Sequence, residues 1–305
     1  MRILLTGSSG FIGSHIAEVL HNKGHKLLLT KRGTSHLWRC ASFIEGVEWV
    51  DCESANFEKE VQSFNPQIII NAAWNGVSAK DRDNWQIQID NLKVQQLLLD
   101  FSDICEIKKY IGIGSQAEYG TFDGIINENF PTNPNSAYGV IKLSAQIIVK
   151  AFCERNNIKW YWFRLFSAFG EKESENWLIP SAIKKMINNK SMDLTPGEQK
   201  YSYLYVQDIA NLFQIAVESN ADCGVYHIAS DEVRQLKTIL ENIKEKVSPS
   251  FKLNFGALPY RTNQSMINGS DNSKTKKAFG NYELSDFNEA INRTVEYYKT
   301  YFCHD

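Results

Sequence analysis

Short apolar runs alternate with helical patterns through the first half of the chain. Continuous apolar runs, such as residues 3–6 (ILLT) and 68–71 (IIIN), are typical of parallel strands that helices cover on both faces. The pattern predicts strands at 2–6, 26–30, 47–50, 67–71, 109–113 and 160–166, and helices at 11–23, 57–64, 83–102 and 137–156. This alternation predicts an α/β fold with a Rossmann-type, doubly wound parallel sheet.

The periodicity becomes looser in the second half of the chain. Helical patterns continue at 180–189, 207–218, 235–246 and 285–301, with short strand-like runs between them. We therefore expect a dinucleotide-binding Rossmann domain over residues 1–166 and a smaller C-terminal α/β substrate lobe over residues 167–305. Residues 226–229 are expected to return to the main sheet.

Composition and charge exclude several classes of protein. The chain has 305 residues, 43% of them apolar and 22% charged, which is enough for a sizeable core. Its net charge of −2 argues against nucleic acid or an anionic membrane as the main partner. No apolar stretch approaches the roughly 20 residues of a membrane helix, and the opening MRILLTGSSG lacks a signal-peptide pattern. These features predict a cytoplasmic protein without a membrane partner.

The six cysteines form no CxxC pair, and no histidine lies at zinc-ligand spacing from another histidine or a cysteine. Scattered cysteines of this kind are typical of reduced thiols in the cytoplasm. We expect no metal site, so the candidate chemistry comes from a glycine-rich turn and from hydroxyl and amino side chains.

A glycine-rich turn with the spacing GxxGxxG lies between the first predicted strand and the first predicted helix. Gly7 permits a tight turn, Gly10 lets the backbone approach a pyrophosphate, and Gly13 lets the helix pack closely on the strand. The first helical residues are Phe11 and Ile12. Their free N–H groups, at the positive end of the helix dipole, face the phosphates. The turn therefore predicts a dinucleotide cofactor.

Two basic residues follow the second predicted strand. An acid at this point usually binds the ribose 2′-hydroxyl of NAD, but Lys31 and Arg32 stand here instead. A cation at this point can bind the 2′-phosphate of NADP. The sequence therefore favours NADP(H) over NAD(H), with a solvated basic loop as the alternative interpretation.

A serine, a tyrosine and a lysine form a second candidate group. Tyr138 and Lys142 are four residues apart on a predicted helix, so they project from one face. A lysine cation next to a tyrosine favours the phenolate and brings the phenol into a useful range for proton transfer. Ser115 follows a predicted strand and can donate a hydrogen bond to a substrate carbonyl or alcohol oxygen. We expect these three residues to be catalytic.

These motifs resemble the extended short-chain dehydrogenase/reductases, specifically the NAD-dependent epimerase/dehydratase family that acts on nucleotide sugars. The resemblance covers nearly the whole chain. It implies that Asp51 contacts the adenine and that Ala72 and Ala73, in the NAA signature, line the cofactor. It also implies that Tyr138 and Lys142 contact the cofactor as well as taking part in catalysis.

The resemblance also implies a set of substrate residues. Arg261 falls where a family arginine contacts the substrate diphosphate, and Ser167 lies in the segment that leads towards the sugar-nucleotide site. Trp74, which follows the NAA signature, and Gln116, which follows the catalytic serine, are expected to face the substrate. Ser167 stands where asparagine is common in the family.

Other departures from the family pattern bear on the reaction. Family dehydratases carry Asp-Glu directly after the catalytic residue, whereas this chain has Gln116 and Ala117, which cannot transfer protons. Tyr201 stands in place of a family arginine before the YVQD segment, so one phosphate or base contact is absent. The resemblance therefore does not imply dehydration.

The phrases GSQAEYG and YLYVQD are similar to those of bacterial reductases of nucleotide-linked 4-keto-6-deoxyhexoses. We therefore expect NADPH-dependent reduction of the C4 keto group of such a sugar, in the synthesis of surface-polysaccharide sugars. An NAD-dependent nucleotide-sugar 4-epimerase and a non-catalytic NADP-binding regulator are the alternatives. The resemblance also implies a homodimer, formed through the helices at 83–102 and 136–156.

Overall fold

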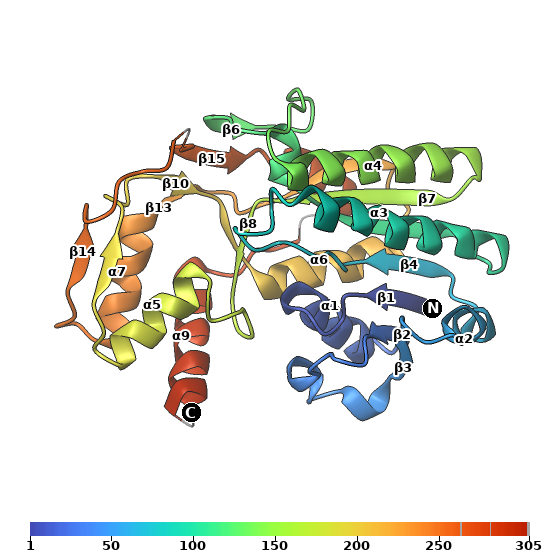
Figure 1. Ribbon diagram of the computed structural model, residues 1–305, viewed down its shortest axis with the longest axis horizontal. Coiled ribbons are helices and arrows are strands. Elements are labelled where there is room, and N and C mark those ends of the chain that lie inside the picture. Colours follow the sequence, from blue (N-terminus) through green and yellow to red (C-terminus); the bar gives the residue numbers. More distant parts are fainter. Residues whose placement is uncertain (263, 281, 304–305) are drawn as a thin grey trace.

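The computed structural model describes residues 1–262, 264–280 and 282–303. Within these residues, the main sheet consists of seven parallel strands in the order β12-β7-β5-β4-β1-β2-β3 (Figure 1). Its strands are β1 (Arg2–Thr6), β2 (Lys26–Lys31), β3 (Glu48–Asp51), β4 (Ile68–Asn71), β5 (Lys109–Ser115), β7 (Lys159–Leu165) and β12 (Gly224–Ile228). The order reverses between β1 and β4, and doubly wound sheets bind ligands at this switch point. The predicted fold class is confirmed.

Helices cover both faces of this sheet because each strand is apolar on both sides. Ile3 and Leu5 lie in one apolar layer, and Leu4, between them, lies in the other. The first layer includes residues of α1 (Phe11–Asn22), α6 (Val206–Glu218) and α8 (Ser273–Phe279). The second includes residues of α2 (Phe57–Phe64), α3 (Trp85–Asp100) and α4 (Ala137–Arg155).

A separate apolar cluster holds the smaller lobe together, on the left of Figure 1. Its helices are α5 (Leu178–Ile187), α7 (Leu236–Val247) and α9 (Phe287–Cys303), which pack on one another. Two short parallel strands, β9 (Met192–Leu194) and β14 (Leu253–Phe255), complete it. Among the described residues, no helix combines the length and the apolar character needed to cross a membrane.

Short strands connect the main sheet with the lobe. A small sheet has the order β13-β10-β15-β6, and a parallel pair joins β8 to β11. Their bounds are β6 (Gly124–Ile126), β8 (Ser167–Phe169), β10 (Lys200–Tyr201), β11 (Tyr203–Tyr205), β13 (Arg234–Gln235) and β15 (Ile267–Ser270). Short 3₁₀ helices include η1 (Trp38–Cys40), η2 (Ile44–Gly46), η3 (Phe101–Asp103) and η4 (Gln116–Tyr119).

Three helices differ from their predicted bounds by two residues at each end, and each start has a local reason. Helix α3 begins at Trp85 because the Asn84 side chain caps it, accepting a hydrogen bond from the Ile87 N–H at 3.2 Å. Helix α5 begins two residues before Pro180, which the first turn of a helix tolerates. Helix α9 begins after Ser285, because hydrogen bonds to Asp208 hold that residue outside the helix.

Candidate active site

The glycine-rich turn connects β1 to α1 at the carboxyl edge of the sheet. Gly7 has a φ of +69°, and the Gly10 N–H donates a hydrogen bond to its carbonyl at 2.9 Å. A Cβ on Gly13 would lie 2.2 Å from the same carbonyl oxygen, so only glycine allows α1 to pack this closely. The first-turn amides of α1, at Phe11 and Ile12, have no acceptor within the helix and are suited to bind phosphate.

The end of β4 lies against this turn. A Cβ on Gly7 would lie 2.5 Å from the carbonyl carbon of Ala72. The Thr6 hydroxyl donates a hydrogen bond to Asn71 Oδ1 at 2.7 Å and accepts one from the Ala73 N–H at 3.2 Å. These contacts hold Ala72 and Ala73 at the switch point, beside the backbone that would carry the pyrophosphate.

Basic and acidic side chains lie side by side at the ends of β2 and β3. Lys31 is in register with Asp51, and Arg32 follows Lys31 as an exposed residue whose N–H donates to Ser35 Oγ at 3.0 Å. Asp51 Oδ2 would lie 3.6 Å from a Cβ on Gly33. The edge of the sheet therefore offers two cations at the end of β2 and one carboxylate from β3.

The predicted catalytic residues come together at the end of β5. Ser115 is the last residue of this strand. Helix α4 begins at Ala137 because the Ser136 side chain caps it, with Oγ accepting a hydrogen bond from the Gly139 N–H at 3.2 Å. Ser115 and Tyr138 are each 7% exposed, and Lys142 is 4% exposed. Ser115 hydrogen-bonds to Tyr138, which acts to lower the pKa of the phenol. The structure thus brings a hydroxyl, a phenol and an amine into one buried group.

Lys142 points towards β5 and the segment after β4. Its Nζ donates a hydrogen bond to the Ile113 carbonyl at 2.6 Å and lies 3.7 Å from the centroid of the Trp74 ring. It is 5.9 Å from the centroid of the Tyr138 ring. Burial lowers the pKa of Lys142 to about 7, and the Glu118 carboxylate acts in the opposite direction.

The Tyr138 phenol has a second cation as a neighbour. Burial raises its pKa above the ordinary value of 10, whereas Arg82 and the hydrogen bond to Ser115 act to lower it. Arg82 Cζ lies 4.8 Å from the centroid of the Tyr138 ring. Arg82 could not be recognised from the sequence, because no local spacing connects a loop residue to a helix that begins more than 50 positions later.

A buried ion pair beneath Ser115 was also missed. Glu118 Oε2 accepts a hydrogen bond from Arg164 Nε at 2.6 Å, and its Oε1 accepts from the Ser115 N–H at 2.8 Å and from Trp162 Nε1 at 2.9 Å. Glu118 is fully buried and Arg164 is 3% exposed. A single arginine within the apolar run 160–166 was the available signal, because a buried cation requires a partner.

The predicted substrate residues lie in two places. Trp74 donates a hydrogen bond to Gln88 Oε1 at 2.9 Å, and its ring meets Tyr138 edge-to-face at 6.1 Å. Gln116 Oε1 accepts a hydrogen bond from Asn268 Nδ2 at 3.3 Å, which connects η4 to β15. Trp74 therefore lies beside Tyr138 and Lys142, and Gln116 lies where η4 meets the small sheet.

Ser167 and Arg261 belong to the side of the lobe. Ser167 is in register with Tyr203 through the parallel pairing of β8 and β11. Arg261 is exposed and near Tyr201, whose pKa it acts to lower while burial raises it. The described contacts do not connect either residue directly to Ser115 or the other catalytic residues.

The loop after β8 contacts the first helix directly and the glycine-rich turn through Arg39 of η1. His15 Nε2 forms a hydrogen bond with the Glu171 carbonyl at 3.0 Å. Arg39 donates one to the Lys172 carbonyl at 2.7 Å and a longer one, at 3.5 Å, to the carbonyl of Ser9 in the glycine-rich turn. The lobe is thereby connected to the segment that would hold the cofactor.

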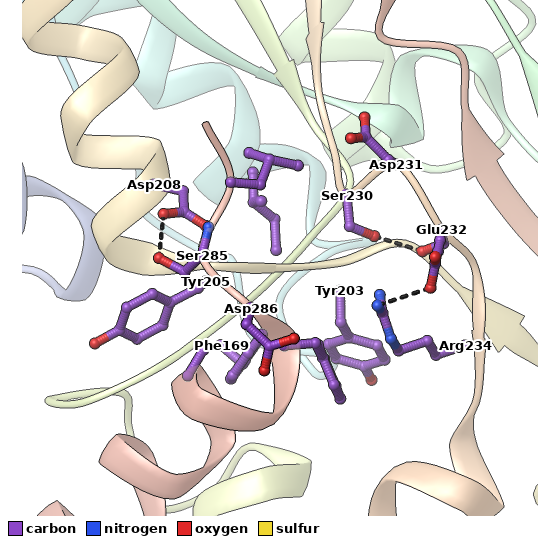
Figure 2. Close-up of a pocket in the computed structure, with 14 residues that line it drawn as sticks. Phe169, Tyr203, Tyr205, Asp208, Ser230, Asp231, Glu232, Arg234, Ser285 and Asp286 are labelled. Atoms are coloured by element: carbon purple, nitrogen blue, oxygen red, sulfur yellow. Dashed lines mark hydrogen bonds and ion pairs between the residues drawn. The ribbon is translucent and has the colours of Figure 1, made fainter. Parts of the chain in front are cut away.

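A further cavity, of about 210 Å³, lies between the start of α6, the loop after β12 and the start of α9 (Figure 2). Asp208, the acid of the YVQD segment, accepts hydrogen bonds from the Ser285 N–H at 3.0 Å and its hydroxyl at 2.7 Å. Arg234 pairs with Glu232 at 2.8 Å. Asp208 therefore holds the chain in place ahead of α9. Its role in these contacts is structural, and it does not contact Ser115, Tyr138 or Lys142 in the described contacts.

The chain is similar to known proteins over most of its length. A model described as the NAD dependent epimerase/dehydratase family matches residues 3–229. The chain belongs to this family. Members of the family that resemble it include nucleotide-sugar modifying enzymes, and the chain is an enzyme of this superfamily.

Two curated relatives cover most of the chain. A CDP-abequose synthase of Yersinia pseudotuberculosis is 24% identical over 272 residues, which are 87% of this chain and 91% of the relative. A dTDP-6-deoxy-L-talose 4-dehydrogenase (NAD(+)) of Aggregatibacter actinomycetemcomitans is 25% identical over 277 residues, 87% of this chain and 98% of the relative. Both have names that concern nucleotide-linked sugars.

Solved structures share the fold at low sequence identity. A UDP-glucose 4-epimerase of Thermotoga maritima, solved with UDP-glucose, has a TM-score of 0.88 and 20% identity, and the match covers 99% of this chain and 100% of that one. A Bordetella bronchiseptica enzyme, WbmH, solved with NAD+, has a TM-score of 0.83 and 21% identity, with 98% of each chain covered. These likenesses concern the fold.

Proposed function

We propose that the protein reduces the C4 keto group of a nucleotide-linked 4-keto-6-deoxy sugar with NADPH, in the synthesis of sugars for bacterial surface polysaccharides. The observation that carries the proposal is the buried group of Ser115, Tyr138 and Lys142 at the carboxyl edge of the sheet, next to the glycine-rich turn. The name of the 4-dehydrogenase relative supports oxidoreduction at position 4 of a deoxy sugar.

The residues of the turn fit a dinucleotide. The first-turn amides of α1 have no acceptor within the helix and are suited to bind a pyrophosphate, and Ala72 lies against Gly7 at the end of the next strand. Asp51 is the residue that we assign to the adenine. A bound nicotinamide cofactor supplies a hydride, and the chain's own groups must position the sugar and supply the proton.

The three buried residues have complementary roles in the proposed reaction. The Ser115 hydroxyl donates a hydrogen bond to the keto oxygen at C4 and polarises the carbonyl. Tyr138 gives its phenolic proton to the same oxygen as the alcohol forms. Lys142 holds the nicotinamide ribose and, in its charged form, stabilises the phenolate. Trp74, Gln116, Ser167 and Arg261 are proposed to bind the sugar and the diphosphate.

We propose NADP(H) rather than NAD(H) as the cofactor. Lys31 and Arg32 occupy the end of β2, where an acid would bind the ribose 2′-hydroxyl. The carboxylate nearby, Asp51, comes from β3. Two cations at this point favour a 2′-phosphate by charge-assisted hydrogen bonds.

Dehydration is not part of the proposal. Gln116 and Ala117 follow the catalytic serine and have no group that can accept or donate a proton in the reaction. Incubation with dTDP-glucose or GDP-mannose should give no 4-keto-6-deoxy product by mass spectrometry. Formation of that product would contradict this assignment.

The decisive experiment is a turnover screen. The purified protein is incubated with NADPH and with dTDP-, CDP- or GDP-linked 4-keto-6-deoxyhexoses, and the reduced nicotinamide is followed by absorbance. We expect stoichiometric consumption of NADPH with one of these sugars. Interconversion of C4 epimers without net consumption would instead indicate a 4-epimerase, and cofactor binding without any turnover would indicate a regulator.

We also propose that the protein is a homodimer, formed through α3 and α4. These helices lie side by side over one face of the sheet (Figure 1) and carry exposed apolar side chains, among them Trp85 at 54% and Ile147 at 55% exposure. Sedimentation should show a dimer that Trp85→Glu with Ile147→Glu converts to a monomer. Ile104→Glu, at an exposed apolar residue outside the two helices, is the matched control.

A further inference from the structure

Arg82 lies in the loop between β4 and α3, and several contacts fix it against the Tyr138 ring. Its Cζ is 4.8 Å from the ring centroid. Its own carbonyl accepts a hydrogen bond from the Tyr138 N–H at 2.8 Å, and its Nε donates one to the Val77 carbonyl at 3.1 Å. The guanidinium is therefore held over the phenol by bonds at the backbone and at the side chain.

The charged groups that face Tyr138 come from three elements. Arg82 faces it from the loop, Glu118 from η4, and Lys142 from the next turn of α4, with Nζ 5.9 Å from the ring centroid. Glu118 acts to raise the pKa of Tyr138, and Arg82 and the hydrogen bond to Ser115 act to lower it. Arg82 is thus the cation whose charged group is nearer to the phenol ring.

The two cations differ in how firmly they keep their charge. Burial lowers the pKa of Lys142 to about 7, so this amine is largely neutral under alkaline conditions. Its Nζ is also engaged by the Ile113 carbonyl and the Trp74 ring. Arginine, in contrast, stays charged at every pH at which a protein is folded.

We propose that Arg82 is a positioning residue for proton transfer: its guanidinium holds the Tyr138 ring by one face and supplies the fixed positive charge that balances the phenolate. This inference rests on the proposed role of Tyr138 as proton donor. When the phenol O–H bond breaks, its proton forms the O–H bond of the sugar alcohol, and a phenolate remains until water returns a proton. A charge that does not titrate keeps this step available when Lys142 is neutral.

The first test titrates Tyr138 in the protein without substrate. Each protein is titrated beside the same protein carrying Tyr138→Phe. The difference in phenolate absorbance between the two reports Tyr138 alone among the 13 tyrosines. Arg82→Gln should raise the midpoint by about one pH unit, the lower end of the effect of an opposite charge within about 6 Å. Arg82→Lys should restore most of the shift, and Lys80→Gln, at an exposed residue of the same loop, should leave the midpoint unchanged. An unchanged midpoint in Arg82→Gln, with circular dichroism showing a folded protein, overturns the proposal.

The second test is the pH profile of turnover. Because burial lowers the pKa of Lys142, this amine balances the phenolate less as the pH rises, so Arg82→Gln should lower kcat by about tenfold at about pH 9 and by about twofold at about pH 6. An equal loss at both pH values would indicate a purely structural role for Arg82 and overturn the proposal. If no 4-keto sugar is reduced, the proposed function fails, but the titration still decides on Arg82 because it needs no substrate.

Discussion

Glu118 and Arg164 form an ion pair of 2.6 Å in the interior, directly beneath Ser115. The second oxygen of the same carboxylate accepts the Ser115 N–H at 2.8 Å. The position of Ser115 at the end of β5 therefore depends on a charge pair that connects η4 to β7.

Glu118→Ala is expected to lower the free energy of unfolding by about 3–5 kcal/mol, because it leaves the Arg164 guanidinium buried without a counter-charge. Urea unfolding measures the change. Glu106→Ala, which removes a carboxylate from an exposed residue, should stay within about 0.5 kcal/mol of the parent. Equal effects of the two substitutions would show that the ion pair contributes little.

Tyr138→Phe removes the proposed proton donor and leaves the ring packing against Trp74 nearly intact. We expect kcat to fall by about 10²–10⁴-fold, because general acid catalysis typically contributes this much. Cofactor affinity, measured by calorimetry, should change little. A variant that kept more than about a tenth of the parent rate would exclude Tyr138 as the principal acid.

Arg32→Asp should reverse the cofactor preference. It removes a cation and places a carboxylate where the ribose 2′-hydroxyl of NAD would lie, so the affinity for NADP(H) should fall by about 10–100-fold and that for NAD(H) should rise. Calorimetric titration with both cofactors checks this. Lys23→Asp, an exposed charge reversal at the far end of α1, is the matched control. Tighter binding of NAD(H) by the unmodified protein would contradict the assignment.

Glu173 gives the protein a predictable pH dependence. Burial raises its pKa from an ordinary value of 4.5 to about 8, so the folded state keeps a proton that the unfolded chain has already released. Stability from this group is fully present below about pH 4.5 and is lost as the pH rises to about 8, with a slope of at most about 1.4 kcal/mol per pH unit. Glu173→Gln should flatten the profile of unfolding free energy across this window. Glu198→Gln, at an exposed carboxylate, should leave the slope unchanged.

The sequence predicted what depends on local pattern. The strands of the main sheet could be recognised because each is apolar on both faces, and helix α2 has the predicted bounds, Phe57–Phe64. The YxxxK spacing predicted that Tyr138 and Lys142 share a helix face, as they do in α4. Such patterns arise from the periodicity of a helix or a strand, so a single segment of the sequence is enough to recognise them.

The remaining features depend on contacts between distant segments. The strands β10 and β13 have two residues each, too few for an alternating pattern, and exist because the small sheet brings them together. Arg82 and Glu118 acquire their importance only from Tyr138 and Arg164, which lie on other elements. Neither pairing has a spacing that a single sequence could reveal.

The loop after β8 has a consequence for how such a protein can diversify. Through Arg39 and His15 it touches both the turn that carries Ser9 and the helix that follows it. Mutations in this loop would therefore also disturb the positions of α1 and of the glycine-rich turn, which are suited to bind a dinucleotide. Changes in β15, which pairs with β6 and β10 and contacts Gln116, would leave α1 untouched, so this side of the site can vary while the glycine-rich turn is kept.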